Sequence, residues 1–364
     1  MDGGGRPVAL KLMRHRHQFE AEVAARVVDG VRLPRSAVIG VLGWHTQAGQ
    51  GLTDELGQRE ELERTPCPLH PLYDEFPHVL VMTRGDRSLH DACNKERLAG
   101  YNLPAIIEVL RAIATKVQQL HAAGLVHGDL KQRNVIRCDS DWVLCDMDAA
   151  GRVGAQIGAK TSTGYGPPEL ACVRFGGRRC GGAADTVEAQ PTFDIWSIGV
   201  VGFELCAGRT LFAQDTANDE LVEESDRTRL CTWDVISDAE LAPVLANAEA
   251  GASTQTQHDA KHLIRLILQG DPARRPSIDE VLNHPFLRLG APPTRPLPMR
   301  FANFLSHAQA DASGMVADLY HAFSRLGLHA WLDSECKITA VLALSLRSSC
   351  TDQRRSVFQC GRQT

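Results

Sequence analysis

The residues best suited to chemistry lie in one short stretch near the middle of the chain. The sequence His127-Gly-Asp-Leu-Lys-Gln-Arg-Asn134 precedes two apolar residues, and Asp146 ends the next apolar run. A carboxylate there can orient a hydroxyl and accept its proton, and a lysine can neutralise a migrating phosphoryl group. Aspartate and asparagine oxygens are ligands that Mg²⁺ prefers. The set therefore predicts phosphoryl transfer.

Apolar periodicity indicates the elements that position this stretch. Residues 104–123 place apolar side chains on one face, with a proline near the start and Gly124 just past the end, as is usual for helix termini. The pattern also predicts helices over residues 193–207, from residue 262 and over residues 277–282. Nearer the N-terminus it predicts buried strands over residues 8–12, 37–43 and 79–82, and a helix over residues 18–28.

Five motifs follow one another in an order that resembles the eukaryotic protein kinase family. Residues 127–134 are similar to its catalytic loop H-R-D-L-K-x-x-N, and residues 146–148 stand where the family has D-F-G. Residues 165–169 resemble the A-P-E end of the activation segment. Residues 194–199 resemble D-x-W-S-x-G, and residues 271–286 match the closing helices. Taken singly, Asp-Leu-Lys is typical of a surface turn, so the ordered set carries the interpretation.

The resemblance implies a role for each residue of the loop. Asp129 would be the catalytic base and Lys131 would steady the transferred phosphate of ATP. Asn134 and Asp146 would hold Mg²⁺. A lysine two residues after the base is the choice of serine/threonine kinases in this family.

The activation segment would supply two further functions. Ser162 or Thr163 would lie beside the substrate hydroxyl, which favours serine/threonine specificity. Glu169 and Arg275 would form a buried ion pair that anchors the segment, a structural role because such a pair must be well made to be tolerated. Asp194 would also be the N-cap of its helix.

The N-terminal part resembles the small lobe of a kinase. Lys11 ends a V-A-L-K strand and would grip the phosphates of ATP, with Glu22 rather than Glu20 as its partner. The alternative interpretation is an exposed strand residue and a solvated helix face.

Residues 79–85 are similar to the strand and hinge that hold adenine. Met82 would guard the back of the pocket, and backbone groups from Thr83 to Gly85 would bind the base. A simple buried strand leading into a turn fits the same residues.

The sequence departs from the family pattern in three places. Gly128 replaces the arginine of H-R-D, which predicts less dependence on a phosphorylated activation segment. Met147 and Asp148 replace Phe-Gly, and the second change removes glycine's backbone freedom. No G-x-G-x-x-G precedes Lys11, so we expect weak ATP binding and low turnover. A weakly active or inactive signalling scaffold is the alternative.

A proline-rich linker over residues 289–300 separates a second region. Residues 301–335 read as strand, helix and strand, with F-L-S-H at the first strand and W-L-D at the second, and they resemble the opening of a Toll/interleukin-receptor (TIR) domain. The alternative is a C-terminal extension that packs on the kinase-like part of the chain. We expect neither a stably folded TIR domain nor NAD cleavage here, and we expect a disordered tail over residues 336–364.

These patterns together predict an α+β, two-lobed kinase-like fold with a partial α/β TIR-like extension. The truncated small lobe would span residues 1–83 and the large lobe residues 84–288. The expected partners are ATP, Mg²⁺, a protein substrate with serine or threonine, and a TIR-type signalling protein.

Composition excludes some functional classes of protein. The chain has 364 residues, 39 basic and 44 acidic side chains and a net charge of −5, which excludes a dominant nucleic-acid-binding surface. No apolar run approaches the ~20 residues of a membrane-spanning helix. The 11 cysteines show no CxxC spacing, so we expect reduced thiols in a cytoplasmic protein.

Overall fold

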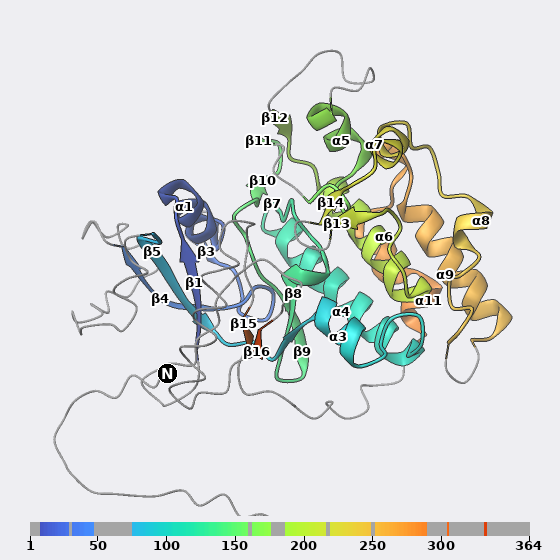
Figure 1. The fold of residues 1–364 in the computed structure, drawn as a ribbon, viewed down its shortest axis with the longest axis horizontal. Helices are drawn as coiled ribbons and strands as arrows, with labels where there is room; N and C mark the ends of the chain where they lie inside the picture. The colour runs from blue at the N-terminus through green and yellow to red at the C-terminus, as the bar shows by residue number, and fades with distance from the viewer. Residues whose placement is uncertain are drawn as a thin grey trace, which may run out of the picture.

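The computed structural model describes residues 8–28, 31–46, 75–158, 162–175, 186–215, 219–248, 252–289, 304–305 and 331–332. Within these residues a small β-rich lobe stands beside a larger helical lobe (Figure 1). The mixture of strands and helices agrees with the predicted α+β class.

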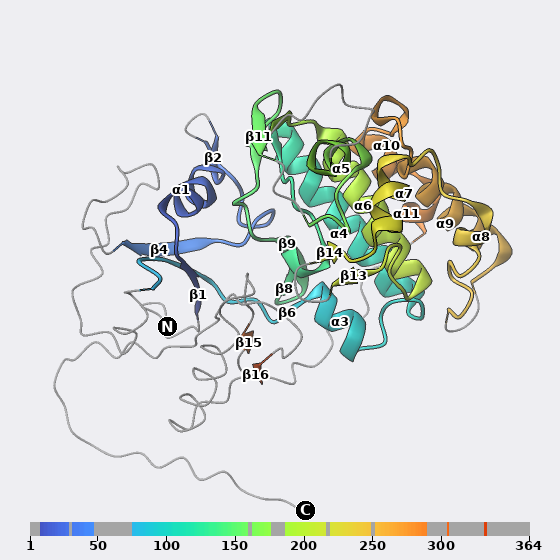
Figure 2. The same ribbon diagram turned by 45° about the horizontal axis from the view of Figure 1, so that its top comes forward.

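The small lobe is built on an antiparallel sheet with the order β1 (Val8–Met13), β5 (His78–Thr83) and β4 (Val41–Thr46). Helix α1 (Arg16–Ala24) contacts β1 and β5 and lies over the sheet in Figure 2. Phe19 from the helix and Leu80 from the central strand are buried together in the core of this lobe.

Two N-terminal predictions were wrong in their bounds. The helix ends at Ala24, because the β-branched pair in β2 (Val27–Val28) turns back to pair with β3 (Val31–Arg32). Residues 37–40 are not a strand: the backbone of Ala37 and Ile39 exchanges hydrogen bonds of 2.8–2.9 Å with Leu144 of the large lobe. The strand that pairs with β5 therefore begins only at Val41.

The large lobe is organised around α4 (Leu103–Ala122) and α6 (Pro191–Ala207), which contact each other. Around them lie α3 (Leu89–Lys95), α5 (Pro168–Phe175), α7 (Glu224–Cys231), α8 (Asp238–Leu241), α9 (Thr254–Ile267), α10 (Ile278–Asn283) and α11 (Pro285–Arg288). Short strand pairs connect the helices: β6 (Arg87–Ser88) with β8 (Val135–Cys138) and β9 (Asp141–Leu144), β7 (Leu125–Val126) with β10 (Gly151–Arg152), β11 (Gln156–Gly158) with β12 (Thr186–Glu188), and β13 (Gln214–Asp215) with β14 (Glu220–Leu221).

Local sequence explains the ends of α4. The Asn102 side chain caps the N-terminus by accepting from the Ala105 amide at 3.1 Å, and Gly124 follows the last turn with a φ of 74°. Helix α6 starts at Pro191, so Asp194 lies inside its first turn and is not the N-cap that we predicted. Its carboxylate turns toward the catalytic loop instead.

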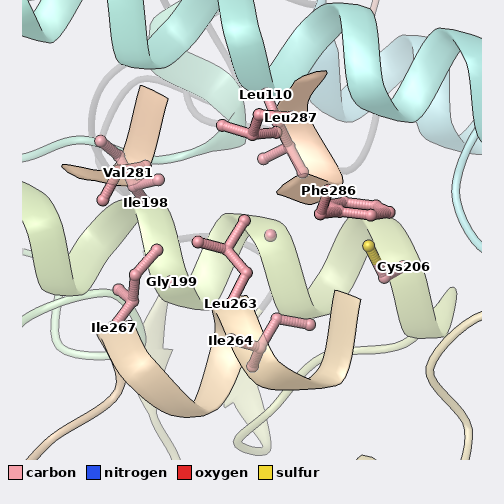
Figure 3. A pocket seen from close by; sticks show the side chains of 11 residues that line it. Leu110, Ile198, Gly199, Cys206, Leu263, Ile264, Ile267, Val281, Phe286 and Leu287 are labelled. Carbon is pink, nitrogen blue, oxygen red and sulfur yellow. The ribbon is translucent and has the colours of Figure 1, made fainter. Parts of the chain in front are cut away.

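Helices α4, α6, α9, α10 and α11 of the large lobe meet at a small apolar cavity (Figure 3). Helix α6 contributes Gly199 and Gly202 to the lining, and α4, α9, α10 and α11 supply branched and aromatic side chains. The cavity encloses about 10 Å³, at the lower limit for one water molecule. The core of the lobe is therefore nearly close-packed at this point.

The second region is described only at its two strands. β15 (Phe304–Leu305) and β16 (Trp331–Leu332) pair in parallel, the direction that a strand–helix–strand unit requires. The helix predicted between them, the linker from residue 290 and the tail lie outside the described residues. Among the described helices, none has the length and apolar content that a membrane crossing needs.

Candidate active site

The loop between β7 and β8 is held by the imidazole of His127. Its Nε2 lies 3.1 Å from the carbonyl oxygen of Cys145, and its Nδ1 lies 3.4 Å from the amide nitrogen of Asp129. This network assigns the proton to Nε2, because Nδ1 must accept from an amide. His127 therefore fixes the Asp129 loop relative to the strand end that carries Asp146.

Asp194 of α6 anchors the same loop through its carboxylate. Its two carboxylate oxygens accept hydrogen bonds from the amides of His127 and Gly128 at 2.9 and 3.0 Å, and Oδ2 lies 2.9 Å from His121 Nε2. Burial acts to raise the pKa of Asp194, but the contacts with His121 and His127 outweigh it and hold the pKa below its ordinary value. Sequence reasoning found Asp194 by its motif and missed this function.

Gly128 occupies a position that only glycine fits easily. Its φ is 78°, and a Cβ placed there would lie 2.6 Å from the carbonyl oxygen of Ala149. The residue that replaces the family's arginine thus lets the loop approach the segment after Asp146 closely.

Asp129, Lys131 and Ser162 converge on one point. Asp129 Oδ1 accepts the Ser162 amide at 2.8 Å, Lys131 Nζ donates to Ser162 Oγ at 2.6 Å, and Lys131 Nζ lies 3.4 Å from Asp129 Oδ2. Burial acts to raise the pKa of Asp129, and the Lys131 charge with the Ser162 amide lowers it further than burial raises it. Asp129 is therefore ionised and oriented at neutral pH.

The structure distinguishes between the two segment residues. Ser162 contacts the catalytic pair, whereas the Thr163 hydroxyl donates to Glu220 Oε2 at 2.7 Å and accepts the Leu221 amide at 2.7 Å. Only Ser162 thus lies beside Asp129.

Asn134 and Asp146 complete the polar side of the site. Asn134 Nδ2 donates to Asp129 O at 2.8 Å and lies 3.3 Å from Asp129 Oδ2, so the amide nitrogen faces the base. Asp146 has a φ of 64°, a left-handed conformation that aspartate tolerates better than most residues. Strain of this kind is concentrated at functional sites.

Lys11 crosses from the small lobe to this polar cluster. Its Nζ lies 2.7 Å from Glu22 Oε2 and 2.5 Å from Asp146 Oδ1. Burial opposes the charge of Lys11, but Asp146 and Glu22 raise its pKa well above the ordinary value. Glu20 instead pairs with Arg16 on the exposed face of α1. The structure thus brings Glu22 to Lys11.

The donor set suits a hard divalent cation. Carboxylate oxygens of Glu22, Asp146 and Asp148 lie within 4.8 Å of one another. Asp148 is not among the described residues with a left-handed backbone, so the loss of glycine there costs no such strain. Asn134 contacts Asp129 through its Nδ2, and its amide oxygen is a further ligand type that Mg²⁺ prefers.

Met82 and Thr83 are the last two residues of β5, and the rest of the predicted hinge follows from residue 84. Met82 is buried in the core of the small lobe. The Thr83 amide donates to Gly40 O at 2.8 Å, so it is not available to a base. A Cβ on Gly85 would lie 2.0 Å from Ile136 Cγ2. The predicted adenine contact then rests on the other backbone groups from Thr83 to Gly85.

Glu169 and Arg275 form a bidentate pair at the foot of the segment. Both Nη–Oε distances are 2.7 Å, and the Arg275 side chain is fully buried. Arg275 also donates to the Gln269 and Thr192 carbonyls and lies over the Trp196 ring. These contacts satisfy the guanidinium, as a buried charge requires.

One buried carboxyl at the site escaped the sequence reasoning. Glu204 in α6 accepts from Tyr165 Oη at 2.8 Å, Gln132 Nε2 at 2.6 Å and Gln214 Nε2 at 3.0 Å. Burial raises its pKa to about 8, although these hydrogen bonds act in the opposite direction. Its acidic side chain after the apolar run of residues 198–203 was the signal in the sequence.

Comparisons with known proteins agree with this geometry. Residues 72–287 match the protein kinase domain family. Similar proteins include a calcium/calmodulin-dependent protein kinase of Emericella nidulans, 28% identical over 50% of this chain and 38% of the relative. Ribosomal protein S6 kinase alpha-2 of Mus musculus is 27% identical over 74% of this chain and 32% of the relative. The SNF-related serine/threonine-protein kinase of Homo sapiens is 26% identical over 79% and 32%.

The matched part of the chain spans 32–38% of the length of these relatives. The family match begins at residue 72, so Lys11 and Glu22 lie outside it. The match nevertheless contains the catalytic loop, Asp146, the activation segment and Arg275, and it extends over more than half of the sequence. The chain therefore belongs to the protein kinase domain family.

Proposed function

We propose that the chain is a serine/threonine protein kinase that transfers the γ-phosphoryl group of ATP to a protein hydroxyl. The observation that carries the proposal is the convergence of Asp129, Lys131 and Ser162, which come from two segments of the large lobe. The names of the relatives, several of which are serine/threonine kinases, support the choice of hydroxyl.

Each residue has a part in the transfer. Asp129 orients the substrate hydroxyl and accepts its proton as the new O–P bond forms and the bond to ADP breaks. Lys131 offsets the negative charge on the moving phosphoryl group. Ser162 contacts both side chains and would lie beside the substrate hydroxyl.

Residues of the small lobe would hold the nucleotide. Lys11, fixed by Glu22, would contact the phosphates, and backbone groups of residues 83–85 would receive the adenine. Mg²⁺ bound by Asn134 and Asp146 would neutralise the phosphates. Asp146 and Lys11 already contact each other, so the nucleotide would bind where the two lobes meet.

The test compares phosphate transfer from Mg-ATP to a generic basic protein by the wild type and by Asp129→Asn. Asparagine keeps the shape of the side chain and removes the base, so we expect a loss of at least about 100-fold. Asp234→Asn, at a side chain 80% exposed, is the control and should retain wild-type transfer. Equal background in the wild type and Asp129→Asn would contradict the kinase proposal and favour the scaffold.

We also propose that residues 301–335 form a TIR-like strand–helix–strand unit that contacts a TIR-type partner. The parallel pairing of β15 with β16 supports it. Amide hydrogen exchange is the test: protection at Phe304 and Trp331 together is expected, and free exchange at both would contradict a folded unit.

A further inference from the structure

The chain between α6 and α7 returns to the catalytic loop as the hairpin β13–β14. Asp219 lies immediately before β14 and has a φ of 56°. Its amide donates to Asp215 O at 2.9 Å, and its carbonyl oxygen accepts the Gly164 amide at 3.0 Å. The residue thus joins the hairpin to the activation segment through its backbone.

The side chain of Asp219 reaches the catalytic loop. Its Oδ2 lies 3.2 Å from Lys131 Nζ and its Oδ1 accepts from Arg133 Nε at 3.1 Å, and the carboxylate is only 10% exposed. An ammonium group has three donors. Lys131 has three acceptors around it, on Asp129, Ser162 and Asp219, so one of its three partners comes from the hairpin.

Further contacts keep the hairpin in this position. Glu220, next to Asp219, accepts from the Thr163 hydroxyl and from Arg174 Nη2 at 2.7 and 2.8 Å. Gln214, on the opposite strand, donates to Glu204 of α6. The hairpin that carries Asp219 is therefore hydrogen-bonded to both α6 and the activation segment.

We propose that Asp219 is a positioning residue for phosphoryl transfer, acting through Lys131. The inference rests on the proposed kinase function. The carboxylate offsets the two cations of the loop and holds the Lys131 ammonium between Asp129 and Ser162. Without it, two cations two residues apart would repel each other, and Lys131 would leave the position from which it meets the phosphoryl group.

A double-mutant cycle tests this coupling. Asp219→Asn keeps the shape and a residue type that tolerates a left-handed backbone, and it removes the charge. We expect kcat to fall about tenfold with KM for ATP unchanged, because misplaced catalytic groups lose rate rather than ground-state binding. In a Lys131→Ala background the same substitution should change kcat less than about twofold.

Glu223→Gln is the matched control, since it removes an exposed carboxylate two residues after β14. Glu223 is the N-cap residue of α7, but its side chain makes no capping hydrogen bond. It should leave kcat unchanged. An equal loss from Asp219→Asn in both backgrounds, or no loss in the wild type, would overturn the positioning role.

A second measurement does not need activity. Removal of Asp219 should lower the pKa of Lys131, which Asp129 and Asp219 raise against burial. Acetic anhydride labelling followed by mass spectrometry should then show several-fold faster modification of Lys131 in Asp219→Asn, with Lys95 unchanged as reference. Unchanged labelling of Lys131 would overturn the inference. Faster labelling in a chain without any transfer would instead leave the inference standing and count against the kinase proposal alone.

Discussion

Lys11 Nζ and Asp146 Oδ1 lie 2.5 Å apart, although 135 residues separate them in the sequence. The contact joins the first strand of the small lobe to the end of β9 in the large lobe. Glu22 completes the group at 2.7 Å from the same nitrogen. The relative position of the two lobes therefore decides whether this site exists.

Glu22→Gln tests the buried part of this group. It removes the carboxylate that lies 2.7 Å from Arg26 Nη1, and it leaves Lys11 with Asp146 as its remaining anionic partner. Breaking a buried pair on one side costs about 3–5 kcal/mol, and we expect a loss of that order in the free energy of unfolding in urea. Glu20→Gln, on the exposed face of the same helix, should cost about 0.5 kcal/mol or less. Similar losses in both variants would contradict the assignment of Glu22.

Gly128→Ala should destabilise the catalytic loop. The added Cβ would sit in a left-handed residue, which costs about 1–2 kcal/mol, and would also lie 2.6 Å from Ala149 O. Gly124→Ala is the control, because Gly124 has a φ of 74° and nothing lies within 4 Å of its Cβ. Thermal unfolding should show the larger fall in Tm for Gly128→Ala. An equal fall in Tm in both variants would mean that the close contact with Ala149 does not affect stability.

Gly202→Ala should stabilise the large lobe. The new methyl group would face the small cavity at 3.6–3.9 Å from Leu110, ordinary contact distances, and alanine is favoured over glycine inside a helix by about 0.5–1 kcal/mol. Gly199→Ala places the same group in the same helix 2.4 Å from Ile267 Cγ2 and should cost about 1–3 kcal/mol. Denaturant unfolding of both variants measures these changes in stability. A loss of stability in Gly202→Ala would contradict the conclusion that the cavity has room for the methyl group.

Glu204 predicts a pH dependence of stability. Its pKa is raised from 4.5 to about 8 by burial, so the folded state binds a proton that the unfolded state has lost between these values. The contribution is fully present below pH 4.5 and is lost as the pH rises to about 8. The free energy of unfolding of the wild type, relative to Glu204→Gln, should therefore fall between pH 5 and pH 8. A difference that stays constant over this range would contradict the raised pKa.

Much of the secondary structure could be predicted from the sequence, because apolar periodicity and capping residues are local signals. The apolar face of residues 104–123 and the capping residues around it predicted α4 to within a residue at each end. Residues 37–43 show the limit of such patterns: their apolar run looks like one strand. The Ile39 amide donates to Leu144 O and the Leu144 amide donates to Ala37 O, so the strand begins only at Val41. No local signal reveals a partner so far along the chain.

The sequence by itself determined the chemistry that is available. The order and type of Asp129, Lys131, Asn134 and Asp146 indicated a kinase, because residue type sets charge, ligand preference and proton affinity. Only the tertiary structure decided which neighbours these groups have. It placed Ser162 rather than Thr163 beside the base, turned Asp194 to the loop amides and brought Asp219 to Lys131. Such contacts join residues 31–88 positions apart, and packing of whole elements fixes them, which no window of sequence encodes.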